Sequence, residues 1–125
     1  MACRAPRGAG IALAALTLIA ACRESAEVVV TRAGDGAVFT VEASGEACVR
    51  SAYVYAEGGT RETPVWSTID GRTARDAPCI TSIRYGVTPE GFSTTPAPVL
   101  KAGQRYRVAL VGGGFNASAR FIAGQ

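Results

Sequence analysis

Residues 100–108 read Leu-Lys-Ala-Gly-Gln-Arg-Tyr-Arg-Val and contain the clearest pattern in the chain. After the turn residue Gly103, the large apolar residues Tyr106, Val108 and Leu110 alternate with charged or small ones. Successive side chains of a β-strand point to opposite faces of a sheet. The alternation therefore predicts a half-buried strand over 105–111.

The same two-residue period recurs along the rest of the chain, with Gly, Pro and Asp at the breaks. It predicts seven strands, over 27–32, 37–43, 47–56, 65–69, 79–87, 105–111 and 117–122. No stretch after residue 25 shows sustained helical periodicity. Seven short strands in about 100 residues predict an all-β domain, an antiparallel immunoglobulin-like sandwich.

The stretch 100–108 resembles the L-x-x-G-x-x-Y-x-V sequence that precedes a late strand in many immunoglobulin-like domains. In that family the tyrosine forms a tyrosine corner, in which its hydroxyl binds a backbone group a few residues upstream. The resemblance implies that the Tyr106 hydroxyl reaches the backbone near Leu100 or Lys101. The alternative is a core tyrosine in another β fold.

The first 22 residues have a different character. Arg4 and Arg7 supply positive charge, and the 15 residues from 8 to 22 are uncharged. This order is typical of the n-region and the h-region of an export signal, which forms a signal helix. A transmembrane helix needs about 20 apolar residues, so a permanent span is disfavoured. The end of the run, Leu18-Ile19-Ala20-Ala21-Cys22, resembles the lipobox of bacterial lipoproteins.

The lipobox resemblance implies that the Cys22 thiol carries acyl chains such as palmitate and that signal peptidase II cuts before it. It divides the chain into a signal peptide (1–21), a lipidated tether (22–26) and the immunoglobulin-like domain (27–125). An aspartate after the cysteine favours the inner membrane in that family, so Arg23 points to the outer membrane, facing the periplasm. The alternatives are an ordinary secretory signal cut after Ala21 and an uncleaved anchor.

The composition argues against several classes of function. The chain has no histidine, so neither a Ser-His-Asp nor a Cys-His arrangement can be built. The cysteine spacing does not suit a zinc site made of four thiolates. No two carboxylates have the spacing of an acid/base pair, so the carboxylates are expected to be solvated. Without Arg4 and Arg7 the chain holds 11 basic and 10 acidic residues, which gives no support to a nucleic-acid partner. We expect no catalytic residue, no metal and no cofactor.

Cys48 and Cys79 remain as an even pair once Cys22 is acylated. The exported compartment is oxidising, and the two residues lie 31 positions apart, at the starts of two predicted strands. We expect a disulfide with its Cα atoms about 4.4–6.8 Å apart. The alternative is two free buried thiols.

Two surfaces are candidates for binding. Four arginines next to inward-facing residues are expected to share one exposed sheet face that meets anionic headgroups or an acidic protein: Arg84, Arg105, Arg107 and Arg120. The alternative is a solvated face balanced by glutamates. The second candidate is the long segment 88–102 around Phe92, because long ordered loops often carry binding. Its alternative is a crossover connection with Phe92 tucked under it.

These features resemble those of the small lipoproteins common in proteobacterial genomes. The resemblance implies a lipid-anchored, non-enzymatic binding or structural module of the cell envelope. Its partners would be the membrane, through the N-terminal lipid, and an envelope protein or polymer. The alternative is an inhibitor or immunity lipoprotein against a hydrolase that attacks the envelope, and an enzyme comes third.

Overall fold

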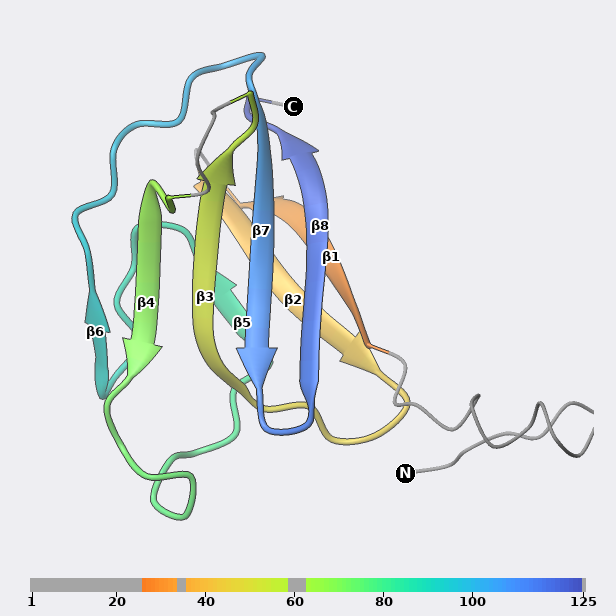
Figure 1. The fold of residues 1–125 in the computed structure, drawn as a ribbon, viewed down its shortest axis with the longest axis vertical. Coiled ribbons are helices and arrows are strands. Elements are labelled where there is room, and N and C mark those ends of the chain that lie inside the picture. Colours follow the sequence, from red (N-terminus) through yellow and green to blue (C-terminus); the bar gives the residue numbers. More distant parts are fainter. Residues whose placement is uncertain (1–25, 34–35, 59–62, 125) are drawn as a thin grey trace, which may run out of the picture.

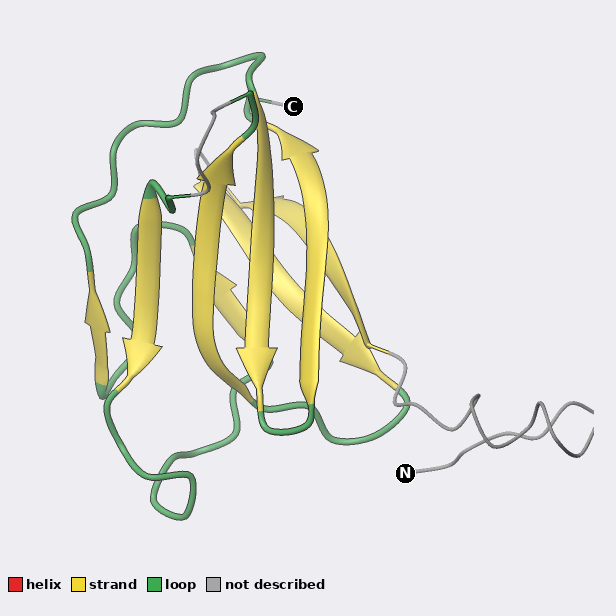
Figure 2. Cartoon of the chain, viewed as in Figure 1, coloured by secondary structure: helices red, strands yellow, loops and turns green. Residues whose placement is uncertain are grey.

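The computed structural model of the protein describes residues 26–33, 36–58 and 63–124. These residues form eight strands and no helix (Figure 2). The strands are β1 (Ala26–Ala33), β2 (Gly36–Ala43), β3 (Val49–Ala56), β4 (Trp66–Asp70), β5 (Ser82–Arg84), β6 (Phe92–Thr94), β7 (Arg105–Gly112) and β8 (Phe115–Ile122). The predicted signal peptide, Cys22 and almost all of the tether lie outside the described residues.

The strands form two sheets that pack face to face (Figure 1). One sheet has three strands in the order β1-β2-β5, and the other has five in the order β6-β4-β3-β7-β8. All pairings between these strands are antiparallel. This confirms the predicted all-β antiparallel sandwich and is consistent with an immunoglobulin-like domain.

The core lies between the sheets and comes from the inward-facing positions of their strands. Its largest fully buried side chains are Trp66, Phe39, Ile83, Leu110, Val49, Val54, Val108 and Thr68. Each large apolar side chain buried in this way stabilises the fold by about 1.5–3 kcal/mol. The sequence left the orientation of β3 open. Ala52 and Val54 face the core, which places Tyr53 and Tyr55 on the outer face of the five-stranded sheet.

The tyrosine corner is present at the start of β7. Tyr106 is buried, and its hydroxyl accepts a 2.9 Å hydrogen bond from the backbone N–H of Lys101. Its ring stacks on that of Phe121, with centroids 5.7 Å apart. The predicted backbone partner is therefore confirmed, and the corner ties the incoming segment to the strand that follows it.

The strand count differs from the prediction, and so do several strand bounds, most of all those of the strand expected over 79–87. The additional strand is β6, which lies inside the segment expected to be a loop and pairs with β4. The expected strand over 79–87 shortens to β5, because only three of its residues pair with β2. The chain after β5 turns away at Gly86, whose φ is +80°, and Val87 is half-exposed.

Candidate functional site

The outer face of the five-stranded sheet brings tyrosines and arginines into one row. In β7, Tyr106 and Val108 point into the core, so Arg107 points outward. The register pairs Arg107 with Tyr55 of β3 on one side and with Arg120 of β8 on the other. Directly opposite residues in a sheet share a face, so these three side chains form a continuous row across β3, β7 and β8. We call this row, with Tyr53 and Arg105, the tyrosine–arginine face.

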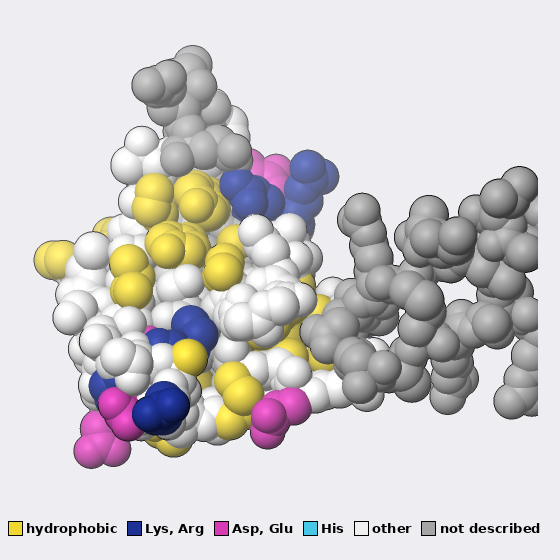
Figure 3. Space-filling view, turned by 60° about the horizontal axis from the view of Figure 1, so that its bottom comes forward, with side chains coloured by type: hydrophobic (Ala, Val, Ile, Leu, Met, Phe, Trp, Pro, Cys, Tyr) yellow, Lys and Arg dark blue, Asp and Glu magenta, His cyan; other side chains and the backbone are white. Residues whose placement is uncertain are grey.

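The contacts within this face hold its aromatic and cationic groups together. The Arg107 guanidinium carbon lies 4.4 Å from the centre of the Tyr55 ring, within the range of a cation–π interaction. The rings of Tyr53 and Tyr55 lie 6.5 Å apart. In Figure 3, hydrophobic side chains over this part of the surface lie next to a cluster of basic side chains. The sheet thus presents a broad aromatic surface with fixed positive charge at one side.

One carboxylate partly balances the arginines. Arg120 forms an ion pair with Glu57, with 3.1 Å between Nε and the carboxylate oxygen. The Arg120 side chain is 79% exposed, and exposed ion pairs stabilise by only about 0–1 kcal/mol. The Glu57 side chain is less exposed, at 28%, so the ion pair sits at the border between the sheet surface and the interior.

The arginines do not all share this face, contrary to the prediction. Arg105, Arg107 and Arg120 lie on the five-stranded sheet, whereas Arg84 lies on β5 of the opposite sheet. The prediction treated every outward arginine as if it belonged to one sheet. Alternation along a strand shows which residues point outward, but it does not show which sheet the strand joins.

Phe92 is not part of an exposed surface. Its side chain is 8% exposed and belongs to the hydrophobic core, so the idea of Phe92 as a binding residue is wrong. Gly91, with φ of +83°, turns the chain so that Phe92 enters β6 opposite Asp70. The alternative, Phe92 tucked under a crossover connection, describes its place correctly.

A buried carboxylate that the sequence did not reveal lies at the end of β4. The Asp70 side chain is 1% exposed and pairs with Arg72 at 3.0 Å and with Arg50 at 3.6 Å. Hydrogen bonds from the Arg72 side chain and backbone hold the pKa of Asp70 below its usual range. Arg72 also donates to the Glu90 carbonyl at 2.6 Å. The cluster joins β3, β4 and the segment before β6, which makes it a structural clamp. The expectation that the carboxylates are solvated is wrong for Asp70.

The predicted disulfide is formed. Cys48 and Cys79 are bonded, with their Cα atoms 4.7 Å apart, and they join the segments that lead into β3 and β5. The two sheets are therefore linked covalently. Glu46 lies beside the two sulfurs. Since these sulfurs are bonded to each other, this group offers no thiolate to a metal.

Among the described residues, no helix is long and apolar enough to cross a membrane. No family model matches the chain, and no curated protein is significantly similar to it in sequence.

Proposed function

We propose that the protein is a lipid-anchored, non-enzymatic binding module of the bacterial envelope. It is held at the membrane by Cys22, and it presents the tyrosine–arginine face to an acidic protein surface. The observation that carries the binding role is the row Tyr55–Arg107–Arg120, which spans three neighbouring strands. The anchor and the outer-membrane location rest on the lipobox sequence.

The chemistry of the face favours a protein partner. Tyrosine and arginine are the residues most often found at the energetic centres of protein interfaces, together with tryptophan. A tyrosine offers a large apolar area with few rotatable bonds, and an arginine can bind a carboxylate through two hydrogen bonds. A flat sheet face with both kinds of side chain suits a flat, acidic patch on another protein.

The distribution of charge supports the same choice. One half of the sandwich contains the end of β1 and the start of β7. Its described residues include six basic side chains and one carboxylate, Glu57. The other half, where β1 begins, holds six carboxylates and three arginines. The lipobox cysteine precedes β1 by four residues. The basic half is therefore remote from the proposed anchor and is directed toward a partner more than toward the headgroups of the same membrane.

The anchor and the binding face are tested separately. Cys22→Ser is expected to move the protein from the membrane fraction to the soluble fraction, and mass spectrometry of the wild-type N-terminus should show an acylated cysteine. Wild type should capture the same acidic periplasmic protein in repeated pull-downs, and Tyr55→Ala with Arg107→Ala should lose it. A matched control is Thr40→Ala, on the opposite sheet.

Each arm has an outcome that overturns its half of the proposal. A free Cys22 in a soluble wild-type protein would refute the anchor. Capture that is unchanged in the Tyr55 and Arg107 variant would refute the binding face. Protection of cells from lysozyme by the wild-type protein would instead identify an inhibitor lipoprotein.

A further inference from the structure

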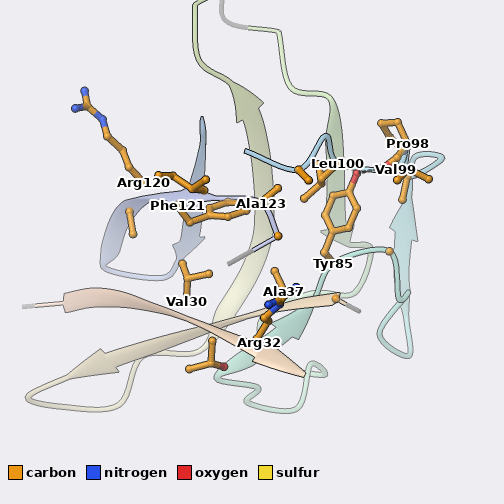
Figure 4. Close-up of a pocket in the computed structure, with 18 of the residues that line it drawn as sticks. Val30, Arg32, Ala37, Tyr85, Pro98, Val99, Leu100, Arg120, Phe121 and Ala123 are labelled. Carbon is orange, nitrogen blue, oxygen red and sulfur yellow. Dashed lines mark hydrogen bonds between the residues drawn. The ribbon is translucent and has the colours of Figure 1, made fainter. Parts of the chain in front are cut away.

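A cavity of about 820 Å³ opens at the basic end of the sandwich, between the two sheets (Figure 4). This volume lies within the range of about 300–1,000 Å³ that is typical of small-molecule sites. Three segments form its walls: the end of β1 with the start of β2, the end of β8, and the connection 97–102 together with Tyr85. Neither the strand pairing nor the tyrosine–arginine face accounts for this space.

The walls of the cavity are mainly apolar. Val30 and Ala37 lie on one side, Phe121 on a second, and Leu100 with the Tyr85 ring on a third (Figure 4). The Tyr85 hydroxyl donates a 2.6 Å hydrogen bond to the Pro98 carbonyl, which fixes the position of this wall. Burial raises the pKa of Tyr85 to about 12, so the wall carries no negative charge at neutral pH. At the rim, Val99 is 93% exposed, which leaves further apolar surface in water.

Two arginines depart from this apolar pattern, Arg32 and Arg120. Arg120 points outward from β8 and pairs with Glu57, which leaves Arg32 as the cation without a carboxylate partner among the described residues (Figure 4). Val28 and Val30 of β1 point inward and pair with the core residues Val41 and Phe39. Arg32 continues the same register, at the point where the core ends and the cavity begins, and its side chain extends from β1 toward the cavity (Figure 4). Among the described residues no carboxylate pairs with Arg32. The described lining residues include no Asp or Glu, so the charge at the mouth is positive.

We propose that this cavity binds a long-chain carboxylate of the fatty-acid class. The hydrocarbon chain occupies the space between Val30, Leu100 and Phe121, and the carboxylate pairs with Arg32 at the mouth. A chain of methylenes needs no hydrogen-bond partners, and each buried methylene contributes about 0.8 kcal/mol. A peptide would bring backbone N–H and C=O groups that these apolar walls leave unpaired.

The only tryptophan of the chain provides a direct reading of occupancy. Trp66 is fully buried, and its ring centroid lies 5.0 Å from that of Tyr85, which lines the cavity. A fatty acid that carries bromine in mid-chain quenches a nearby indole. The titration uses the full-length chain with Cys22→Ser, so that no acyl chain of the protein itself competes, and it stays below the micelle concentration of the fatty acid. We expect saturable quenching of the Trp66 fluorescence.

Three variants and one ligand analogue make the test specific. Arg32→Met is expected to weaken binding about ten-fold or more, because it keeps an unbranched, mainly apolar side chain and removes the charge. The methyl ester should bind wild type as weakly as the acid binds this variant. Arg75→Met removes an exposed arginine at the far end and should leave binding unchanged. Ala97→Phe narrows the cavity from an exposed position and should reduce binding without loss of the fold, which near-ultraviolet circular dichroism checks.

The proposal fails if wild type shows no saturable quenching. It also fails if the acid and its methyl ester bind equally, or if Arg32→Met binds as tightly as wild type. Because Tyr55 and Arg107 lie outside the cavity, Tyr55→Ala with Arg107→Ala should bind the fatty acid normally. A failure of the fatty-acid proposal therefore does not count against the proposed protein contact. A failure of the protein contact likewise does not count against fatty-acid binding.

Discussion

At the scale of single residues, Tyr106 shows how a hydroxyl can matter apart from its ring. Tyr106→Phe keeps the stacking on Phe121 but leaves the N–H of Lys101 without its acceptor. We expect a loss of about 1–3 kcal/mol, at the lower end because the bond is only partly buried. Tyr106→Ala also removes the ring and should cost about 3–5 kcal/mol. Urea unfolding measures both values, and equal midpoints for wild type and Tyr106→Phe would show that the corner contributes nothing.

The ionisation of Asp70 makes the stability of the fold depend on pH in the acid range. Arg72 holds the pKa of Asp70 below that of an unfolded aspartate, which is about 3.9. A carboxyl with a lower pKa in the folded state stabilises the fold above the unfolded pKa. That stabilisation is lost as the pH falls through the folded pKa. We therefore expect Asp70→Asn to lower stability at pH 7 and to flatten its decline below about pH 4.

Urea unfolding at a series of pH values checks this prediction. The matched control is Glu90→Gln, which removes an exposed carboxylate from the segment that the clamp holds but leaves the Glu90 carbonyl that Arg72 binds. Only Asp70→Asn should show a smaller loss of unfolding free energy as the pH falls below about 4. Parallel curves for Asp70→Asn and wild type would mean that the ion pairs with Arg50 and Arg72 do not contribute to folding.

At the scale of strands, the disulfide links the two sheets covalently, next to the backbone hydrogen bond from Val49 to the Ile80 carbonyl. Cys48 and Cys79 close a loop with a sequence separation of 31. Replacement of both cysteines by alanine frees this loop in the unfolded chain, and we expect a loss of about 2–5 kcal/mol. Thermal and urea unfolding of the double variant measure it. If the double variant unfolds at the wild-type midpoint, the backbone bond between Val49 and Ile80 alone fixes this junction.

The strands also show where sequence reasoning succeeds and where it fails. Long strands with clear alternation, such as β2 and β7, were predicted to within about a residue at each end, because the large apolar residues of one face enter the core at every second position. The three residues of β6 are too few to display a period. They form a strand because Gly91 directs Phe92 into the core and Thr94 bonds to Thr68 across the pair. Short edge strands of this kind depend on tertiary contacts that leave no local pattern.

At the scale of the whole molecule, the candidate site was only partly predictable. The arginines Arg105, Arg107 and Arg120 were found from alternation, but their tyrosine neighbours were not. Tyr55 reaches Arg107 because β3 pairs with β7, and this pairing joins strands that lie about 50 residues apart in the chain. The cavity was invisible for the same reason, since its walls come from both sheets. The alternation of residue types shows which side chains share one face of a strand. Only the order in which the strands pair shows which of these faces lie next to each other.

The uneven distribution of charge and the proposed anchor together predict how the domain stands on the membrane. Cys22, the proposed anchor, is separated from β1 by residues 23–25, so the end of the sandwich at which β1 begins should lie close to the bilayer. The eight residues of β3 rise about 3.3 Å each, which places the opposite end roughly 25 Å further out. Lys101 lies at that opposite end, is exposed, and is the only lysine of the chain.

If the amino group of Cys22 is acylated, as the proposed anchor implies, an amine-reactive fluorophore labels Lys101 alone. With the wild-type protein in vesicles that carry a lipid-bound energy acceptor, we expect weak transfer from the label on Lys101. The control is Lys101→Arg with Glu46→Lys, which moves the only amine to an exposed position near the start of β3 and should give strong transfer. Equal transfer from both positions would mean that the domain lies along the membrane. The tyrosine–arginine face would then be close enough to meet headgroups, and the proposed acidic protein partner would lose its support.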